Sequence, residues 1–177
     1  MKKINLPFKK NELNKLKKGN EVLLTGIIYT ARDQAHARLQ KAIKSNKGLP
    51  LNLKGQIIYY CGPTNTPKGK VIGSCGPTTS SRMDTFTEDL LKIGLRGMIG
   101  KGIRSQQVLQ AIKKYKAIYF LTYAGCGALL SKYVKTKKIA AYPDLGPEAI
   151  YKLEVVDFPL IVGIDSKGNN IFSQKGF

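Results

Sequence analysis

The sequence is poor in features that would narrow its class at once. Its three cysteines, Cys61, Cys75 and Cys126, are widely spaced and form no C-x-x-C pair. This spacing excludes a disulfide framework and a self-contained zinc or iron-sulfur site, so we expect small buried thiols. No apolar run is long enough to span a bilayer, and no apolar segment follows the lysines of "MKKINLPFKK" as in a secretory signal. A cytoplasmic protein without a membrane partner is therefore expected.

Acidic residues are also scarce, with 11 Asp and Glu against 30 Lys and Arg, which gives a net charge of +19. Such a charge invites a nucleic-acid interpretation. Many lysines, however, alternate with apolar residues, as in "LQKAIKSNKG" and "YVKTKKIAAY", which is typical of solvated faces. No RRM-like aromatic pattern or helix-turn-helix signature accompanies them. Nucleic acid is thus disfavoured as the main ligand, and the charge can equally serve to dock an acidic partner subunit.

A chain of 177 residues with 42% apolar and 23% charged residues suits one globular domain. Residues 1–20 are polar and lysine-rich, and we expect them to form an N-terminal arm with a short helix around "KNELNKLKKG". Residues 21–177 then form the single domain. No internal repeat or low-complexity linker divides it further.

Apolar periodicity predicts strands and helices that interleave along the domain. The expected strands are 21–31, 56–61, 70–74, 96–102, 117–127, 137–142 and a hairpin over 158–172, and the expected helices are 33–45, 85–95, 105–116 and 128–134. The turn residues of "GPTNTPKG" indicate that 56–61 and 70–74 are joined as a hairpin or meander. Asp33 and Ser105 are expected as N-caps, and Thr85 with Glu88 as a capping box. Because several neighbouring strands are joined by turns, the fold class is mixed α/β with a mixed sheet, not a doubly wound parallel sheet.

Three cationic side chains share one context. Arg32 follows an apolar strand, Arg82 follows the glycine-rich "GSCGPTTSS", and Lys101 lies in "GMIGKG". Loops of this kind over a sheet let backbone N–H groups and cations approach an anion. Two arginines and one lysine fit a small di-acid, although a phosphate ligand is also compatible. The loop lacks the spacing of a P-loop, and no dinucleotide fingerprint precedes a helix.

The hydroxyls of Thr78 and Thr79 raise the question of a nucleophile or base. A threonine hydroxyl is weak in either role unless a neighbour activates it, and His36 is the single histidine of the chain. These hydroxyls can instead cap the following helix. His36 lies one turn after Arg32, so it is a candidate site residue, while a packed or surface histidine is the alternative. Asp33, beside Arg32, is a further candidate.

Four long motifs closely resemble the β subunit, or C-terminal domain, of class I fumarate hydratases and of the related L(+)-tartrate dehydratases. They are "IIYTARDQAHAR", "IIYYCGPTNTPKGKVIGSCGPTTSSRMD", "GLRGMIGKG" and "AAYPDLGPEAIYKLEVVDFPLIVGIDSKGN", in order over about residues 20–172. The resemblance implies a swivelling β/β/α domain and a hydro-lyase that interconverts fumarate and (S)-malate. It also implies a 4Fe-4S cluster that acts as Lewis acid and is bound by a partner α subunit in an α2β2-like assembly, with no metal ligand in this chain.

The same resemblance implies roles for individual residues. Arg32 of "T-A-R-D", Arg82 of "G-P-T-T-x-x-R-M-D" and Lys101 of "G-K-G" match substrate-holding positions, with Gly76 and Thr79 of the loop beside them. Thr78 matches the position of the family's general base, assisted by a carboxylate of the α part. L(+)-tartrate dehydration is the alternative within this class. A stand-alone basic module that binds nucleic acid or anionic metabolites is the alternative from another class, and it predicts a steep salt dependence of binding.

Overall fold

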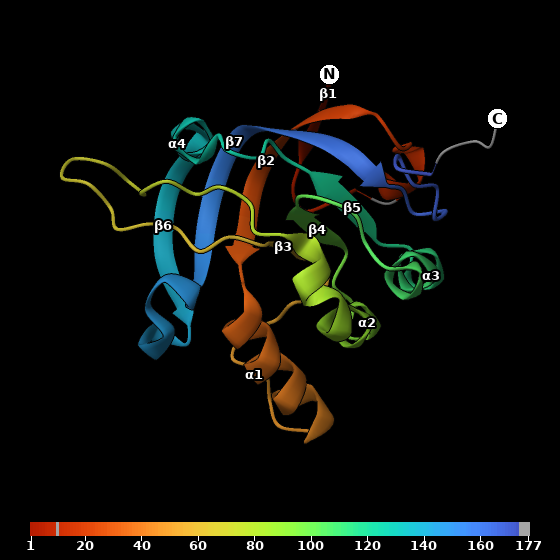
Figure 1. The fold of residues 1–177 in the computed structure, drawn as a ribbon, viewed down its shortest axis with the longest axis horizontal. Coiled ribbons are helices and arrows are strands. Elements are labelled where there is room, and N and C mark those ends of the chain that lie inside the picture. The colour runs from red at the N-terminus through yellow and green to blue at the C-terminus, as the bar shows by residue number, and fades with distance from the viewer. Residues whose placement is uncertain (10, 174–177) are drawn as a thin grey trace.

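The computed structural model describes residues 1–9 and 11–173, which form helices packed on a mixed sheet of seven strands (Figure 1). The strands are β1 (Lys2–Asn5), β2 (Glu21–Thr30), β3 (Ile57–Tyr59), β4 (Gly97–Gly100), β5 (Ile118–Leu121), β6 (Val134–Ala141) and β7 (Ile150–Ile164). The predicted mixed α/β class is confirmed. Among the described residues, no helix has the length and apolar character needed to cross a membrane.

The sheet combines a parallel centre with a long antiparallel strand. Strands β2, β3, β4 and β5 run parallel in that order, and β7 is antiparallel to β5, β6 and β2. Because β7 pairs with both β5 and β2, the pairing returns to its starting strand and closes a ring. The carboxyl ends of the four parallel strands therefore meet at one edge, where sites of α/β proteins form.

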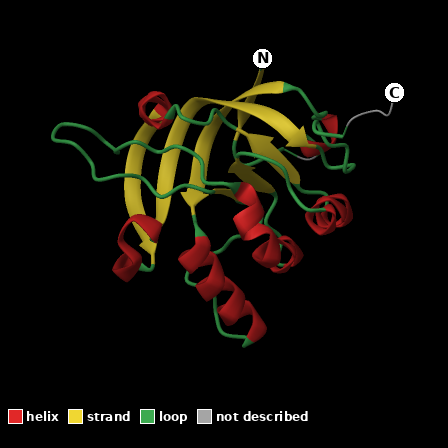
Figure 2. Ribbon diagram, viewed as in Figure 1, coloured by secondary structure: helices red, strands yellow, loops and turns green. Residues whose placement is uncertain are grey.

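The helices are α1 (Asp33–Lys44), α2 (Asp84–Lys92), α3 (Gln106–Tyr115) and the short α4 (Gly127–Leu130), with 3-10 turns at Leu13–Lys15, Ser80–Met83, Ser131–Tyr133 and Pro143–Glu148. Figure 2 shows α1, α2 and α3 gathered on one side of the strands and α4 on the other side. Ser105 caps α3, because its hydroxyl accepts the Val108 N–H at 3.3 Å, as predicted.

The sheet separates two apolar clusters, and β3 shows how the sequence builds both. Ile57 and Tyr59 face the cluster between the strands, whereas Ile58 and Tyr60 face the cluster beneath the helices. All four side chains are buried, so this short strand is covered on both faces. The continuous apolar run "IIYY" is what such a strand requires, because an alternating pattern would bury polar side chains on one of the two faces.

The strand expected at 70–74 is wrong. Residues 62–79 instead form a long loop whose two arms meet at Thr64 and Ser74. There the Thr64 N–H donates to Ser74 O, and the Ser74 N–H donates to the Thr64 hydroxyl, both at 2.9 Å. The path is that of a hairpin, but Pro63 and Pro67 lack the N–H groups that a continued ladder would need.

Two expected helix caps are also wrong. Asp33 is the first residue of α1 rather than its cap, and the Gln34 N–H donates to the Glu148 carboxylate at 2.9 Å. Helix α2 begins at Asp84 with no side-chain cap, so Thr85 and Glu88 form no capping box. The 3-10 turn Ser80–Met83 runs directly into α2, and such a turn satisfies N–H groups that a cap would otherwise bind.

The first twenty residues are partly integrated into the sheet. β1 pairs in parallel with β2, and Ile4 and Leu16 are buried in the cluster between the strands. Only Leu13–Lys15 is helical in the segment where a short helix was expected, and Lys10 lies outside the described residues. At the other end, β7 begins at Ile150, earlier than predicted, and a bridge from Ile164 to Asn170 confirms the expected C-terminal turn.

Candidate active site

The sequence-predicted residues come together at the carboxyl edge of the parallel strands. Arg32 follows β2, and Lys101 follows β4. Between them, the Thr78 N–H donates to Tyr60 O at 2.7 Å, and Thr79 forms a parallel bridge with Lys101. The "GPTTSSRMD" segment therefore crosses the ends of β3 and β4 and brings Arg82 to the same edge as Arg32.

Arg32 and Arg82 converge on one carboxylate, that of Asp33. Arg82 binds it through two nitrogens, with Nε 3.0 Å from Oδ1 and Nη2 2.9 Å from Oδ2. Arg32 Nη2 lies 3.7 Å from the same Oδ2. Side-on, two-point contact of this kind is the geometry with which arginine recognises planar carboxylates. The edge thus already binds a carboxylate, and that carboxylate belongs to the protein.

Arg32 is enclosed by backbone and by a second acid. Its Nη2 lies 3.7 Å from Glu148 Oε1, and its Nε is buried without a hydrogen-bond partner among the described residues. A Cβ placed on Gly62 would meet Arg32 Cδ at 2.9 Å and Nη1 at 3.0 Å. A glycine is therefore required at 62 for the arginine side chain to lie where it does.

The hydroxyls of the loop differ in their environment. Thr78 is half-buried and Thr79 is exposed, whereas Ser80 is fully buried. The Lys101 N–H donates to Ser80 Oγ at 3.0 Å, and Tyr119 Oη lies 2.9 Å from both Ser80 Oγ and Gly102 O. Because Gly102 O can only accept, Tyr119 donates to it and receives the Ser80 proton. Ser80 thus anchors the loop and leaves the two threonine hydroxyls unburied.

Gly76 lies where the loop packs against the segment after β5. A Cβ on Gly127 would meet Gly76 N at 2.7 Å, and the Cys75 N–H donates to Gly127 O at 3.1 Å. The two backbones can approach this closely because residue 127 is a glycine, whereas a Cβ on Gly76 would meet Gly127 Cα at an ordinary 3.5 Å. This contact fixes the half-buried Gly76 at the start of the "GPTTSSRMD" segment.

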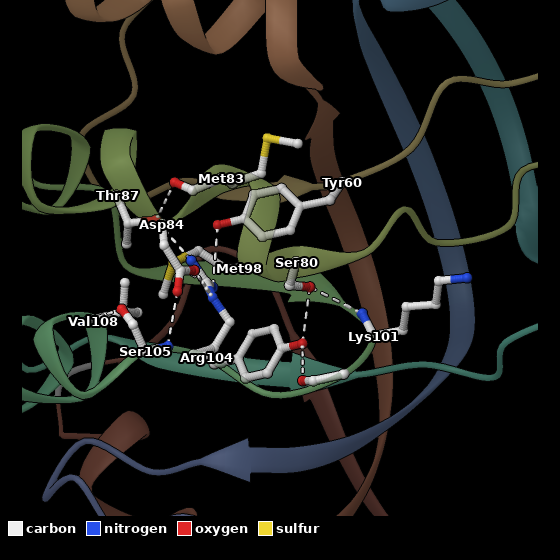
Figure 3. Close-up of polar contacts among 12 residues, drawn as sticks. Tyr60, Ser80, Met83, Asp84, Thr87, Met98, Lys101, Arg104, Ser105 and Val108 are labelled. Carbon is white, nitrogen blue, oxygen red and sulfur yellow. Dashed lines mark hydrogen bonds and ion pairs between the residues drawn. The ribbon is translucent and has the colours of Figure 1, made fainter.

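Lys101 presents a charge that no acid of the described chain neutralises. It is half-buried, and within residues 1–9 and 11–173 its ammonium forms no ion pair. Figure 3 shows its side chain extending away from Ser80, while its backbone N–H points to the Ser80 hydroxyl. Of the three predicted cations, Lys101 therefore has the charge that is most available to a ligand.

A buried ion pair between Arg104 and Asp84, which was not predicted from the sequence, lies at the end of the "GPTTSSRMD" segment (Figure 3). The Arg104 side chain is 0% exposed, with Nε 2.6 Å from Asp84 Oδ1 and Nη2 2.7 Å from the Thr87 hydroxyl. Burial lowers the pKa of Arg104, but Tyr60 and Asp84 outweigh that effect and raise it overall. No motif distinguished Arg104 from the other basic residues, because its burial depends on distant segments.

His36 is packed beneath Arg32. It is 1% exposed, its ring lies against Tyr60 and Phe86, and its Nδ1 lies 2.8 Å from Arg32 O. A carbonyl can only accept, so Nδ1 carries the proton and Nε2 is left buried without a partner. Burial lowers the pKa of His36 to about 4, and Arg104 adds to this effect against the hydrogen bond with Arg32. The imidazole is therefore neutral and does not reach the surface.

Two of the three cysteines, Cys61 and Cys75, have surroundings that do not suit an iron-sulfur cluster. Cys61 and Cys75 are fully buried, and burial raises the pKa of Cys61 well above its usual value and that of Cys75 to about 12. Cluster ligation needs thiolates, whereas these surroundings favour protonated thiols. Among the described residues, no group of three or more His, Cys, Asp or Glu side chains is placed to hold a metal ion.

Fold and site together define a mixed α/β domain in which two arginines meet around the Asp33 carboxylate and a lysine lies at the same edge of the parallel strands. The family model described as "Fumarase C-terminus" matches residues 1–175, and this chain belongs to that family.

Three relatives illustrate the similarity. The aerobic class I fumarate hydratase of Escherichia coli K12 is 41% identical over 175 residues, which are 97% of this chain and 32% of that protein. "Fumarate hydratase 2" of Leishmania major is 39% identical over 168 residues, 93% of this chain and 29% of that protein. The Methanocaldococcus jannaschii protein named "Putative L(+)-tartrate dehydratase subunit beta" is 40% identical over 171 residues, 93% of this chain and 88% of that protein. The chain thus spans about a third of the fumarate hydratases and most of the β subunit.

Proposed function

We propose that this chain is the β subunit of a hydro-lyase that reversibly hydrates fumarate to (S)-malate. The observation that carries the proposal is the pair of arginines, Arg32 and Arg82, that meets around a carboxylate at the strand edge. The names of the Escherichia coli and Leishmania relatives support fumarate as the substrate. In this proposal Arg32, Arg82 and Lys101 bind the two carboxylates of the di-acid, and Gly76 and Thr79 contribute the backbone and hydroxyl of the loop.

Thr78 is proposed as the general base. In the dehydration direction the activating carboxylate takes the hydroxyl proton of Thr78, and the Thr78 oxygen receives the proton that leaves C3 of malate. Hydroxide leaves C2, and the electron pair of the broken C3–H bond forms the C2–C3 double bond. In hydration the same proton returns to C3. A threonine hydroxyl needs an activating group, which we assign to a carboxylate of the partner, because the nearby Asp33 carboxylate is engaged with the two arginines.

A partner α subunit is part of the proposal. The 4Fe-4S cluster would be carried by that subunit, since the Cys61 and Cys75 thiols do not suit cluster ligation. The cluster would supply Lewis acidity to the leaving hydroxyl. Two large apolar side chains, Ile103 and Tyr123, are exposed just after β4 and β5, beside the site. Apolar surface at this edge is consistent with its being covered in an α2β2-like assembly. A cytoplasmic location stays a prediction.

L(+)-tartrate dehydration is a second candidate, because the relative that is a separate β subunit carries that name. The two activities differ at C3, where tartrate has a hydroxyl and malate has none. Thr78 would face that substituent in either case. Assays with both substrates therefore decide between them.

The test is anaerobic turnover by this chain alone and after mixing with its cluster-loaded α subunit, followed by the absorbance of the fumarate double bond. We expect activity only in the mixture. In that mixture Thr78→Ala should lower kcat by about 10²–10⁴-fold, as loss of a general base does. Arg82→Met should lower kcat/KM by about 10–100-fold, from the loss of roughly 1.5–3 kcal/mol of charge-assisted hydrogen bonding.

Matched controls are available outside the site. Thr85 is an exposed threonine on α2, and Arg38 pairs with Asp144 on the surface, so Thr85→Ala and Arg38→Met should retain wild-type rates. Wild-type rates in Thr78→Ala or Arg82→Met would remove that residue from the mechanism. A mixture active on tartrate but not fumarate would replace the substrate. A mixture inactive on both would favour the basic binding module.

A further inference from the structure

The Asp33 carboxylate contacts both site arginines, and it uses their donors unequally. Arg82 gives it Nε and Nη2 at 3.0 and 2.9 Å, whereas Arg32 approaches only to 3.7 Å through Nη2. A guanidinium has five N–H donors in one plane. The side-on contact with Asp33 occupies two of those on Arg82, so the outer edge formed by Nη1 and Nη2 stays open for a second carboxylate.

The fold holds Asp33 more firmly than it holds Arg82. Asp33 is the first residue of the twelve-residue helix α1, and the next N–H, that of Gln34, is bound by Glu148. Arg82 lies on the short 3-10 turn Ser80–Met83, and its side chain is 51% exposed. An exposed arginine otherwise loses rotamer freedom when it binds a ligand. A fixed carboxylate that holds it in advance removes part of that cost.

We propose that Asp33 is a positioning residue: it orients Arg82, and with it Arg32, so that the open Nη1/Nη2 edge of Arg82 meets a substrate carboxylate. The inference rests on the proposed function and adds a role for an acid within a site that binds an acid. The opposite role is that Asp33 competes with the substrate for Arg82. The two roles predict opposite changes in affinity when the Asp33 charge is removed.

The test uses Asp33→Asn and Asp33→Glu in the assembled enzyme, with Asp144→Asn as matched control. Asp144 also binds an arginine, Arg38, through both carboxylate oxygens, and it lies on the surface outside the site. If Asp33 positions Arg82, Asp33→Asn should raise KM for fumarate about tenfold and change kcat less, because a preformed contact is lost. Asp33→Glu should restore part of the affinity, and Asp144→Asn should match the wild type. An unchanged or lowered KM in Asp33→Asn would overturn the proposal.

A second readout does not depend on activity. In the isolated chain labelled with 15N-arginine, the hydrogen-bonded Arg82 Nε–H should give a slowly exchanging signal that is assigned by its loss in Arg82→Met. That signal should exchange faster in Asp33→Asn but not in Asp144→Asn, and succinate should bind more weakly to Asp33→Asn. A signal and a succinate affinity that are indifferent to Asp33→Asn would refute the positioning role. If the assembled enzyme turned over neither substrate while Asp33→Asn still changed the Arg82 exchange and the succinate affinity, the proposed function would be refuted and the positioning role of Asp33 would stand.

Discussion

The buried contact between Arg104 and Asp84 makes a strong prediction for Asp84→Asn. The carboxylate binds Arg104 Nε at 2.6 Å through one oxygen and accepts the Ser105 N–H at 2.7 Å through the other. It therefore joins the start of α2 to the start of α3, at the end of the "GPTTSSRMD" segment. In Asp84→Asn the shape is kept, but the Arg104 charge loses its counter-charge within the protein.

The size of the effect follows from burial. The Arg104 side chain is 0% exposed, so water cannot replace the lost partner. Leaving one buried charge unpaired costs about 3–5 kcal/mol. For a protein of this length, each kcal/mol lowers Tm by about 2–4 °C, so the variant should melt roughly 6–20 °C below the wild type.

Thermal unfolding followed by circular dichroism and equilibrium unfolding in urea would both measure this. The control is Asp144→Asn, whose ion pair with Arg38 is exposed and should hardly affect Tm. A double variant, Asp84→Asn with Arg104→Met, should recover part of the loss because it removes the buried charge as well. If Asp84→Asn lowers Tm no more than Asp144→Asn, the reasoning about the unpaired charge is refuted.

Two further predictions concern His36 and Gly62. Because the pKa of His36 is about 4 in the folded chain and about 6.5 when unfolded, only the unfolded state takes up a proton between these values. The free energy of unfolding should therefore fall by up to about 3 kcal/mol as pH drops from 6.5 to 4, and urea titrations should show a weaker fall in His36→Asn. Gly62→Ala should displace Arg32 and raise KM about tenfold, because its Cβ would lie 2.9 Å from Arg32 Cδ, whereas Gly48→Ala has open space and should be neutral. Equal KM values in the two alanine variants would contradict this placement of Arg32.

Much of the fold follows from local pattern. β2, β4, β5, α1 and α3 lie where apolar spacing predicted them, because each has a face that must be buried. The first half of β7 also alternates, with Leu153 and Val155 buried between exposed neighbours, but it was not predicted as strand. Its partners in β2 lie far away in the sequence. Pairing at that distance is decided by the whole fold, which local alternation does not encode.

In the candidate site, too, some features could be predicted from local sequence and others could not. That Arg32, Arg82 and Lys101 share an edge could be predicted, because each follows a strand or precedes a helix. That Asp33 binds Arg82 could not, since the two are brought together only by the packing of α1 beside the 3-10 turn Ser80–Met83. The burial of Arg104 could not be predicted either, because it also depends on the packing of segments that are distant in the sequence. Arginine on the surface and arginine in a core look alike in a sequence.

The closed ring of strands has a consequence for how the chain folds. β2 pairs with β1 and β3, which are near it in the sequence, but among the described strands its other edge pairs with the distant β7, with Glu21 opposite Ile161. A ribosome therefore releases most of the chain before that edge can close, and forming such distant contacts carries a large entropic cost. Until β7 arrives, the nascent protein presents unpaired backbone on both β2 and β5, the kind of open edge that joins one molecule to another. The arrival of β7 thus ends the period in which these open edges let aggregation compete with folding.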